Sequence, residues 1–180
     1  MNSYMNFSHY IKINTLVPFI FSVSLCIVAF DVSYGQSTQI LTTEEKEVMD
    51  IVHLFFKSMT ERDTITTKAI LTKDGQYYAL REEENGLFQR TVSHKDYIKR
   101  LGSQTDLVQE RIWDPLVNVH KRIAMVWAPY DIYINGNFLH CGVDSFSLIK
   151  TEEGWKIAGV VFTMEPEGCE ESPLEPLNKN

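Results

Sequence analysis

Two aspartates and a histidine stand close together in a segment of the chain that is rich in β-branched and aromatic residues. They are Asp131, His140 and Asp144. A carboxylate beside an imidazole fixes its tautomer and raises its basicity, so Asp131 could orient His140 as a general base near neutral pH. A carboxyl group in an apolar pocket keeps its proton and can donate a hydrogen bond, a role that suits Asp144 as the acid. The alternative is a polar cluster that serves structure alone.

These candidate catalytic residues are placed by a predicted β-hairpin and a third strand over residues 123–157. Asn135-Gly136, between two stretches of alternating apolar residues, predicts a two-residue turn. With this turn, Asp131 lies directly opposite His140. Asp144 projects from the same face because side chains alternate along a strand. The register therefore predicts that all three groups face one hollow.

Large apolar side chains share this predicted face, and a one-residue slip in register would expose them all. They could form an aromatic clamp for a flat ligand, or they could simply be core residues. The opposite face carries Val126, Tyr130 and Ile132, and such a moderately apolar face could be the contact of a homodimer. The candidate ligand-binding residues are Trp127, Tyr133, Phe138, Phe146 and Trp155.

The composition of the 180-residue chain suggests one domain with a real core, since 44% of its residues are hydrophobic. The formal net charge is −7 and no basic stripe is present, which argues against nucleic-acid binding. The sequence holds no serine-nucleophile motif, glycine-rich phosphate loop or Cys-x-x-Cys pair, so no cofactor is predicted. His140 with Asp131 and Asp144 could ligate iron or zinc, but their spacing does not demand a metal and none is predicted.

Residues 1–35 have the features of a signal peptide. Lys12 precedes an apolar run over residues 16–30, and the small residues Ser33 and Gly35 predict cleavage before Gln36. The run is shorter than the ~20 residues needed to cross a bilayer, so we expect no stable membrane anchor after cleavage. An uncleaved anchor is the alternative. The mature protein is expected to be exported, in a periplasmic or extracellular location.

Cleavage leaves two cysteines, Cys141 and Cys169. An even number of cysteines in an oxidising compartment favours a disulfide. Cys169 lies beyond the last predicted strand, so the tail would have to fold back to reach Cys141. Two inert thiols are the alternative, and the sequence leaves both open.

The remaining patterns predict two helices, a short hairpin, a third helix and a four-strand meander. A capping box at Thr42 to Glu45 begins the first helix, Asp63 caps the second and Ser93 the third. A long strand over 108–119 is kinked at Asp114-Pro115. Helices segregated from a strongly curved, mostly antiparallel sheet indicate an α+β fold, a cone-shaped barrel wrapped around the long N-terminal helix. The predicted limits are a linker over 36–43, a domain over 44–164 and a flexible tail over 165–180.

This arrangement resembles the nuclear transport factor two-like superfamily, which includes ketosteroid isomerase, scytalone dehydratase and SnoaL-type cyclases. Within it, the chain is similar to the exported branch labelled putative lumazine-binding, over residues 44–169. The resemblance implies the cone-shaped fold, but this fold hosts enzymes, carriers and interaction domains alike. The residues that carry it are Phe55-Phe56, Met59, Asp63, Trp127-Ala128-Pro129-Tyr130-Asp131, Gly136, His140-Cys141-Gly142, Phe146 and Gly154-Trp155-Lys156-Ile157.

Three functions follow as expectations. The leading one is binding of a small hydrophobic or aromatic molecule in the hollow. The second is a cofactor-independent isomerase, dehydratase or hydrolase that uses the His140–Asp131 pair with Asp144 as acid. The third is a non-catalytic dimerisation module that uses the outer face. No residue matches the general-base aspartate or the oxyanion-hole pair of ketosteroid isomerase, so the resemblance assigns no catalytic roles.

Overall fold

The computed structural model describes residues 40–169, 172–175 and 177. The predicted signal peptide and the first half of the predicted linker lie outside the described residues. Within them, the elements follow in the order α1 (Thr43–Glu61), α2 (Thr64–Ile70), β1 (Leu71–Glu83), β2 (Gly86–Ser93), α3 (His94–Ser103), β3 (Val108–Ile112), β4 (Leu116–His120), β5 (Ile123–Ile134), β6 (Asn137–Thr151) and β7 (Gly154–Thr163).

The helices begin where the sequence provides capping side chains. At α1 the Thr42 hydroxyl accepts from the Glu45 amide and the Glu45 carboxylate accepts from the Thr42 amide, which confirms the capping box. The side chains of Asp63 and Ser93 accept from first-turn amides of α2 and α3. The apolar stripe of α1, which includes Val52, is fully buried in the core.

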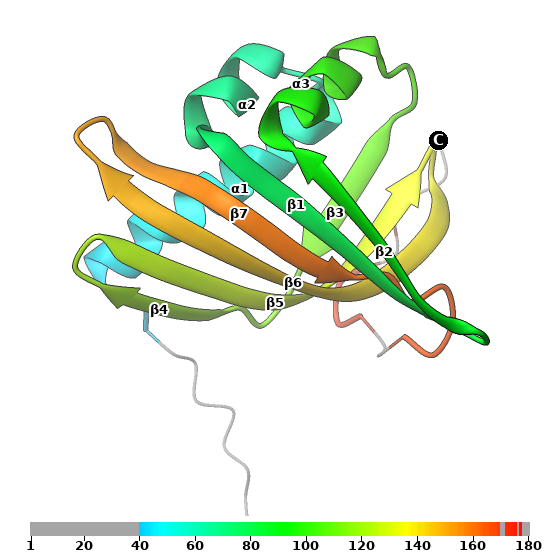
Figure 1. The fold of residues 1–180 in the computed structure, drawn as a ribbon. Helices are drawn as coiled ribbons and strands as arrows, with labels where there is room; N and C mark the ends of the chain where they lie inside the picture. The colour runs from blue at the N-terminus through cyan, green and yellow to red at the C-terminus, as the bar shows by residue number, and fades with distance from the viewer. Residues whose placement is uncertain (1–39, 170–171, 176, 178–180) are drawn as a thin grey trace, which may run out of the picture. The chain divides into compact units, whose positions relative to one another are not determined.

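The strands form one sheet in the order β2-β1-β7-β6-β5-β3, with β4 also paired to β5. Every pair is antiparallel except β1 with β7, which is parallel. The sheet curves, and the helices lie on its concave side (Figure 1). The predicted α+β fold, with a curved and mostly antiparallel sheet around a long first helix, is confirmed.

The predicted kink at Asp114-Pro115 is a complete break between two strands. Asp114 has a φ of 43°, and β3 and β4 on either side of the break both pair with β5. Proline has no amide hydrogen to donate to a ladder, so the strand ends before it. The break leaves β3 over one half of β5 and β4 over the other half.

The turn between β5 and β6 forms as predicted. Asn135 and Gly136 have φ values of 52° and 73°, the left-handed conformations that a tight hairpin turn of this type needs at both central residues. Tyr133 lies opposite Phe138, as the predicted register requires. The Asn-Gly turn therefore fixes the register of the residue pairs next to it.

The predicted register is wrong beyond that pair, because Leu139 bulges out of β6. Ile132 lies opposite His140, and Asp131 lies opposite Cys141 rather than His140. A bulge places two residues of one strand against one of its partner. Every side chain of β5 before the bulge therefore projects from the face opposite to the predicted one.

A second bulge, at Ala158 of β7, has the same effect on the next strand. Asp144 lies opposite Phe162, whereas the predicted register placed it opposite Val161. Gly159 follows the bulge directly, and a glycine inside a strand often marks such an irregularity. With both bulges, the concave face carries the residues that pack on the helices and line the space between them.

Candidate ligand-binding cavity

A cavity of about 300 Å³ lies between α1, α3 and the concave face of the sheet. Apolar side chains form most of its wall, and every strand except β4 contributes to it. The volume is at the lower end of the range for small-molecule sites, which are usually apolar with a few placed polar groups. The polar side chains at its wall include Tyr77, Tyr97, Glu110, Tyr130, His140 and Asp144.

Two carboxyl groups meet inside this cavity. Glu110 projects from β3 and Asp144 from β6, and their side chains lie within hydrogen-bonding reach of each other. Burial raises the pKa of Asp144 to about 7. Burial, followed by the charge of Asp144, raises the pKa of Glu110 well above its ordinary value. The pair titrates as a unit and holds at least one proton at neutral pH.

Asp144 is 2% exposed and has no cationic partner. Its Oδ2 atom meets no hydrogen-bond donor among the described residues. The salt bridges found in residues 40–169 include neither Asp144 nor Glu110. A buried carboxyl oxygen without a partner is costly, so Oδ2 of Asp144 is a place for a donor from solvent or ligand.

Two tyrosine hydroxyl groups near this pair are also without partners. The hydroxyls of Tyr77, on β1, and Tyr97, on α3, are buried and make no hydrogen bond among the described residues. The two rings lie 4.7 Å apart between centroids. Burial raises the pKa of both tyrosines, so each keeps its proton and offers a hydrogen-bond donor to the cavity. Buried polar groups without partners require an explanation, and bound solvent or ligand is one.

A third tyrosine fixes the protonation of His140. Tyr130 donates its one hydroxyl hydrogen to the Thr163 carbonyl at 2.6 Å, and its oxygen lies 3.1 Å from Nδ1 of His140. The second contact is a hydrogen bond when Nδ1 carries the proton, which leaves Nε2 with a free lone pair. Burial lowers the pKa of His140, so the ring is neutral at neutral pH.

The structure corrects the predicted pairing of Asp131 with His140. Asp131 points to the convex face of the sheet, where both of its carboxylate oxygens accept hydrogen bonds from Arg111. Arg111 also donates to the Glu175 carbonyl at 2.6 Å. Asp131 therefore cannot orient His140, and Tyr130 takes that position. Because Asp131 lies on the opposite face from His140 and Asp144, these three residues cannot ligate one metal ion. No group of three possible metal ligands is found among the described residues.

The predicted aromatic clamp is also largely corrected. Phe146 lines the cavity, edge-on to Phe55 and Phe56 with centroids 6.0 and 5.7 Å away. Trp127 is 48% exposed on the convex face, because the bulge at Leu139 reverses β5.

Three further predicted aromatic residues lie away from the cavity wall. Tyr133 and Phe138 pack edge-to-face on each other, with centroids 5.7 Å apart. Trp155 is buried in the core beneath Lys150. The residues predicted for the outer face lie on the concave face instead. Val126 and Tyr130 are buried, and Ile132 lines the cavity.

Sequence reasoning missed Glu110, although the sequence contains a signal for it. Val108, Glu110 and Ile112 alternate along one strand, so a glutamate stands on an apolar face. Tyr77 alternates with Ala79 in the same way on β1. The apolar neighbours of Glu110 on its face, Val108 and Ile112, pack on the core and hold it at the cavity even though β3 lies at the edge of the sheet.

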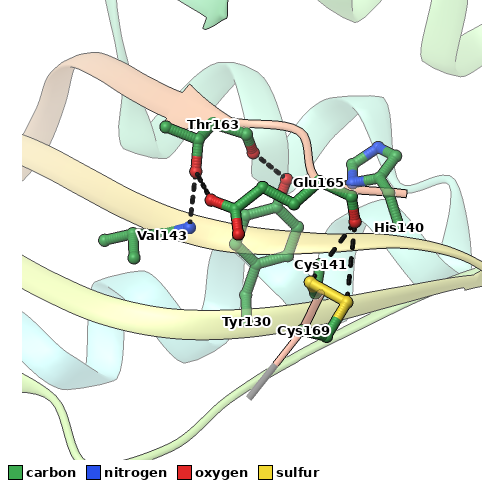
Figure 2. The surroundings of a disulfide bond; sticks show 7 residues. All are labelled: Tyr130, His140, Cys141, Val143, Thr163, Glu165 and Cys169. Carbon is green, nitrogen blue, oxygen red and sulfur yellow. Dashed lines mark hydrogen bonds between the residues drawn. A yellow bond between two sulfur atoms is a disulfide. The ribbon is translucent and has the colours of Figure 1, made fainter. Parts of the chain in front are cut away.

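A disulfide joins the segment after β7 to β6 (Figure 2). Cys141 and Cys169 are joined, and Cys141 exchanges two backbone hydrogen bonds with Glu165. Thr163 accepts from the Val143 amide at 3.0 Å and donates to the Glu165 carboxylate at 2.9 Å. The composition predicts a loose tail here, but these contacts tie its first residues to β6.

The glycine after Cys141 makes this arrangement possible. A Cβ atom on Gly142 would lie 2.3 Å from the Thr163 carbonyl oxygen. That carbonyl is the acceptor for the Tyr130 hydroxyl, so the close approach of β7 to Gly142 also sets the Tyr130–His140 contact.

The sequence over residues 43–163 matches the family described as "Putative lumazine-binding". The chain belongs to this family. The match covers well over half of the chain and confirms the predicted resemblance to the proteins labelled putative lumazine-binding. No curated protein matches the sequence. No helix of the described residues is long and apolar enough to cross a membrane.

Solved structures of NTF2-like proteins share the fold that the resemblance implied. An NTF2-like protein from Cytophaga hutchinsonii has a TM-score of 0.57 at 12% identity, over 68% of this chain and 99% of its own. An NTF2-like superfamily protein from Salmonella enterica has a TM-score of 0.54 at 14% identity, over 69% and 93%. A putative dehydratase of the NTF2-like family from Streptomyces avermitilis has a TM-score of 0.53 at 17% identity, over 68% and 96%. At these identities the likeness concerns the fold alone.

Proposed function

We propose that this family member is an exported protein that binds a small molecule with an apolar or aromatic body in the cavity between α1, α3 and the sheet. The observation that carries the proposal is the set of buried polar atoms without partners in the wall of a mostly apolar cavity. They are the hydroxyls of Tyr77 and Tyr97 and Oδ2 of Asp144. The description of the family supports a bicyclic heteroaromatic ligand such as lumazine.

The test is binding of indole and of lumazine, measured by ligand-observed NMR, to the wild type and to two matched variants. Ala79→Phe fills the cavity from β1, where Ala79 is buried and lines the wall. Ser147→Phe adds the same ring to an exposed position on the convex face of β6. We expect at least one probe to bind the wild type and Ser147→Phe and to lose binding in Ala79→Phe. Binding that survives in a folded Ala79→Phe protein would contradict the proposal.

The neutral His140 favours a second candidate function, general-base catalysis in the same cavity. Because Tyr130 holds the proton on Nδ1, the Nε2 lone pair is free to accept a proton from a bound substrate. The carboxyl pair of Glu110 and Asp144 would supply the acid. This version of the enzyme hypothesis replaces Asp131 with Tyr130 as the residue that positions His140.

A model reaction tests whether His140 can act as a base. In the ring opening of nitrobenzisoxazole, the base removes the ring C–H proton, the N–O bond breaks, and its electron pair becomes the coloured phenolate. We expect a rate above that of buffer, lost in His140→Gln, with the pH profile of a base whose pKa is below the ordinary histidine value. Rates equal in wild type and His140→Gln would exclude this role.

Export is part of the proposal, and the disulfide supports it. Disulfides persist in oxidising compartments and are rare in the cytosol. The test is the N-terminal sequence of the protein recovered from its native cells, in which we expect Gln36 to be the first residue. An N-terminus that retains the apolar run would contradict cleavage.

A further inference from the structure

We infer that the polar end of the cavity recognises a cationic nitrogen, a protonated amine or amidinium group carried on an apolar body. The inference rests on the proposed function and narrows its ligand class. Two carboxyl groups from different strands, Glu110 on β3 and Asp144 on β6, converge on one space without a cation from the protein.

The protein pairs its other buried aspartate, and this contrast is informative. Asp131, 4% exposed, is neutralised by Arg111 through two hydrogen bonds. Arg90 and Arg100 both line the cavity, yet neither forms a salt bridge with Glu110 or Asp144 in the part of the chain that the structure describes. A buried acidic pair is stabilised by a proton or by a cation, and a ligand can bring the cation.

An independent observation points to a ligand at the same place. The Tyr77 side chain is 7% exposed, lines the cavity, and its hydroxyl has no partner among the described residues. Tyr97 lies beside it with a second unpartnered hydroxyl. Tyrosine rings attract cations through their faces, so these side chains and the carboxyl pair favour the same ligand chemistry.

Glu110 and Asp144 are the acidic side chains that line the cavity. The tyrosines keep their protons and His140 is neutral, as derived above. The charge of Asp131, on the other face of the sheet, raises the pKa of Glu110 further. From β1, β2, α3, β5 and β6, the facing groups are Tyr77, Arg90, Tyr97, Arg100, Tyr130 and His140.

The protonation of Glu110 and Asp144 should make the affinity for a cationic ligand depend on pH. A monocation needs at least one ionised carboxyl, so its affinity should rise as the pair loses its protons. The burial-raised pKa of Asp144, about 7, places this rise between about pH 5.5 and about pH 8.5. A neutral ligand that accepts a hydrogen bond from a protonated carboxyl should lose affinity over the same range.

The experiment compares two pairs of probes that differ in charge, benzamidine with benzamide and phenethylamine with phenethyl alcohol. Dissociation constants are measured by titration calorimetry or NMR at both ends of the pH range. We expect each cation to bind the wild type at least about tenfold more tightly than its neutral partner at the higher pH. We expect this preference to shrink at the lower pH.

Variants test whether the two carboxyl groups cause the preference for the cationic probes. Asp144→Asn and Glu110→Gln remove a charge from the cavity with little change in shape, and each should reduce the preference for the cations. Asp131→Asn makes the same chemical change on the opposite face and should leave the preference intact. The wild-type pH dependence tests the inference even if a variant does not fold.

Three outcomes would overturn the inference: no binding of either cation, equal binding of cations and neutral partners, or a preference that survives Asp144→Asn combined with Glu110→Gln. Tight binding of the neutral probes, lost in Ala79→Phe, would leave the proposed small-molecule function standing while rejecting the cationic ligand. Failure of every probe, including indole and lumazine, would reject both.

Discussion

Asp131 and Asp144 are two buried aspartates on neighbouring strands, and they differ in whether the protein supplies a cationic partner. Asp131, on the convex face, accepts two hydrogen bonds from Arg111, which also donates to the carbonyl of Glu175 in the described part of the tail. Asp144, on the concave face, has a carboxyl neighbour and no cation. Burial alone therefore does not mark a functional carboxyl in this protein. A buried group whose partner is missing does, because the fold has left that interaction to something else.

The same contrast extends to other residues on the two faces. On the convex side, groups near β6 are bonded to each other within the protein. Cys141 forms a disulfide with Cys169, and Thr163 donates a hydrogen bond to Glu165. On the concave side, two tyrosine hydroxyls face the cavity without partners. The convex side therefore pairs its polar groups within the protein, whereas the concave side, which also packs on the helices, leaves two hydroxyls without a partner.

The largest expected loss of stability follows Phe146→Ala on the concave face. Phe146 is 1% exposed and packs against two phenylalanines of α1. Truncation removes this packing and enlarges the cavity, so we expect the free energy of unfolding to fall by about 4 kcal/mol in urea denaturation. A loss near zero would mean that the helix does not pack on the sheet at this position.

Removing the disulfide on the convex face should have the next largest effect. The bond closes a loop with a sequence separation of 28, and a cross-link of that length stabilises by about 3.5 kcal/mol in the chain-entropy description. We expect Cys141→Ser with Cys169→Ser to lose about this amount while indole binding is kept. Loss of binding in a folded double variant would show that the two faces are coupled through Tyr130.

Asp144→Asn should change the pH dependence of stability. The pKa of Asp144 is raised in the folded protein, so the folded state binds its proton more tightly than the unfolded chain does. The resulting stability is present below about pH 4 and is lost as the pH rises through about 7. The variant should therefore gain on the wild type by on the order of 3 kcal/mol as the pH rises from about 4 to about 7. Parallel curves for the two proteins would contradict a proton held by the pair.

Asp131→Asn should destabilise the protein without affecting the cavity. Arg111 would keep its charge in a site that is only 16% exposed at that side chain and would lose its partner. We expect a loss of about 2 kcal/mol, less than for a fully buried pair. Adding Arg111→Gln should restore part of it, because the stranded charge is then removed. Loss of indole binding in Asp131→Asn would contradict the assignment of this residue to the convex face.

The smallest effect is expected from Trp127→Glu, because the side chain is 48% exposed. The free energy of unfolding should fall by about 1 kcal/mol or less. The homodimer predicted through Val126, Tyr130 and Ile132 would need residues that are buried or line the cavity. Sedimentation of the wild type and of this variant tests instead whether the convex face, with Trp127 and its cross-strand neighbour Leu116, forms a dimer contact. A wild-type protein that sediments as a monomer at all concentrations would exclude this interface.

Local sequence signals predicted much of the fold correctly. The capping side chains of Thr42, Asp63 and Ser93 start the helices where expected, and Asn135-Gly136 forms the expected turn. Each of these signals acts within a few residues, because a cap or a turn satisfies neighbouring backbone groups. The α+β class and the curved sheet follow from the order of such elements.

The composition of the site depended on two single-residue bulges, at Leu139 and Ala158. The sequence placed His140, Asp144 and Phe146 on the concave face, and the structure finds all three at the cavity. The bulge at Leu139 exchanged Asp131 for Tyr130 as the neighbour of His140, because a shift of one residue reverses every side chain of a strand. Both faces of β5 are apolar enough to be buried, so the pattern of residues could not choose between them. That choice was made by the packing of the sheet against α1 and α3, which also brought Glu110 to Asp144 from a strand far away in the sequence.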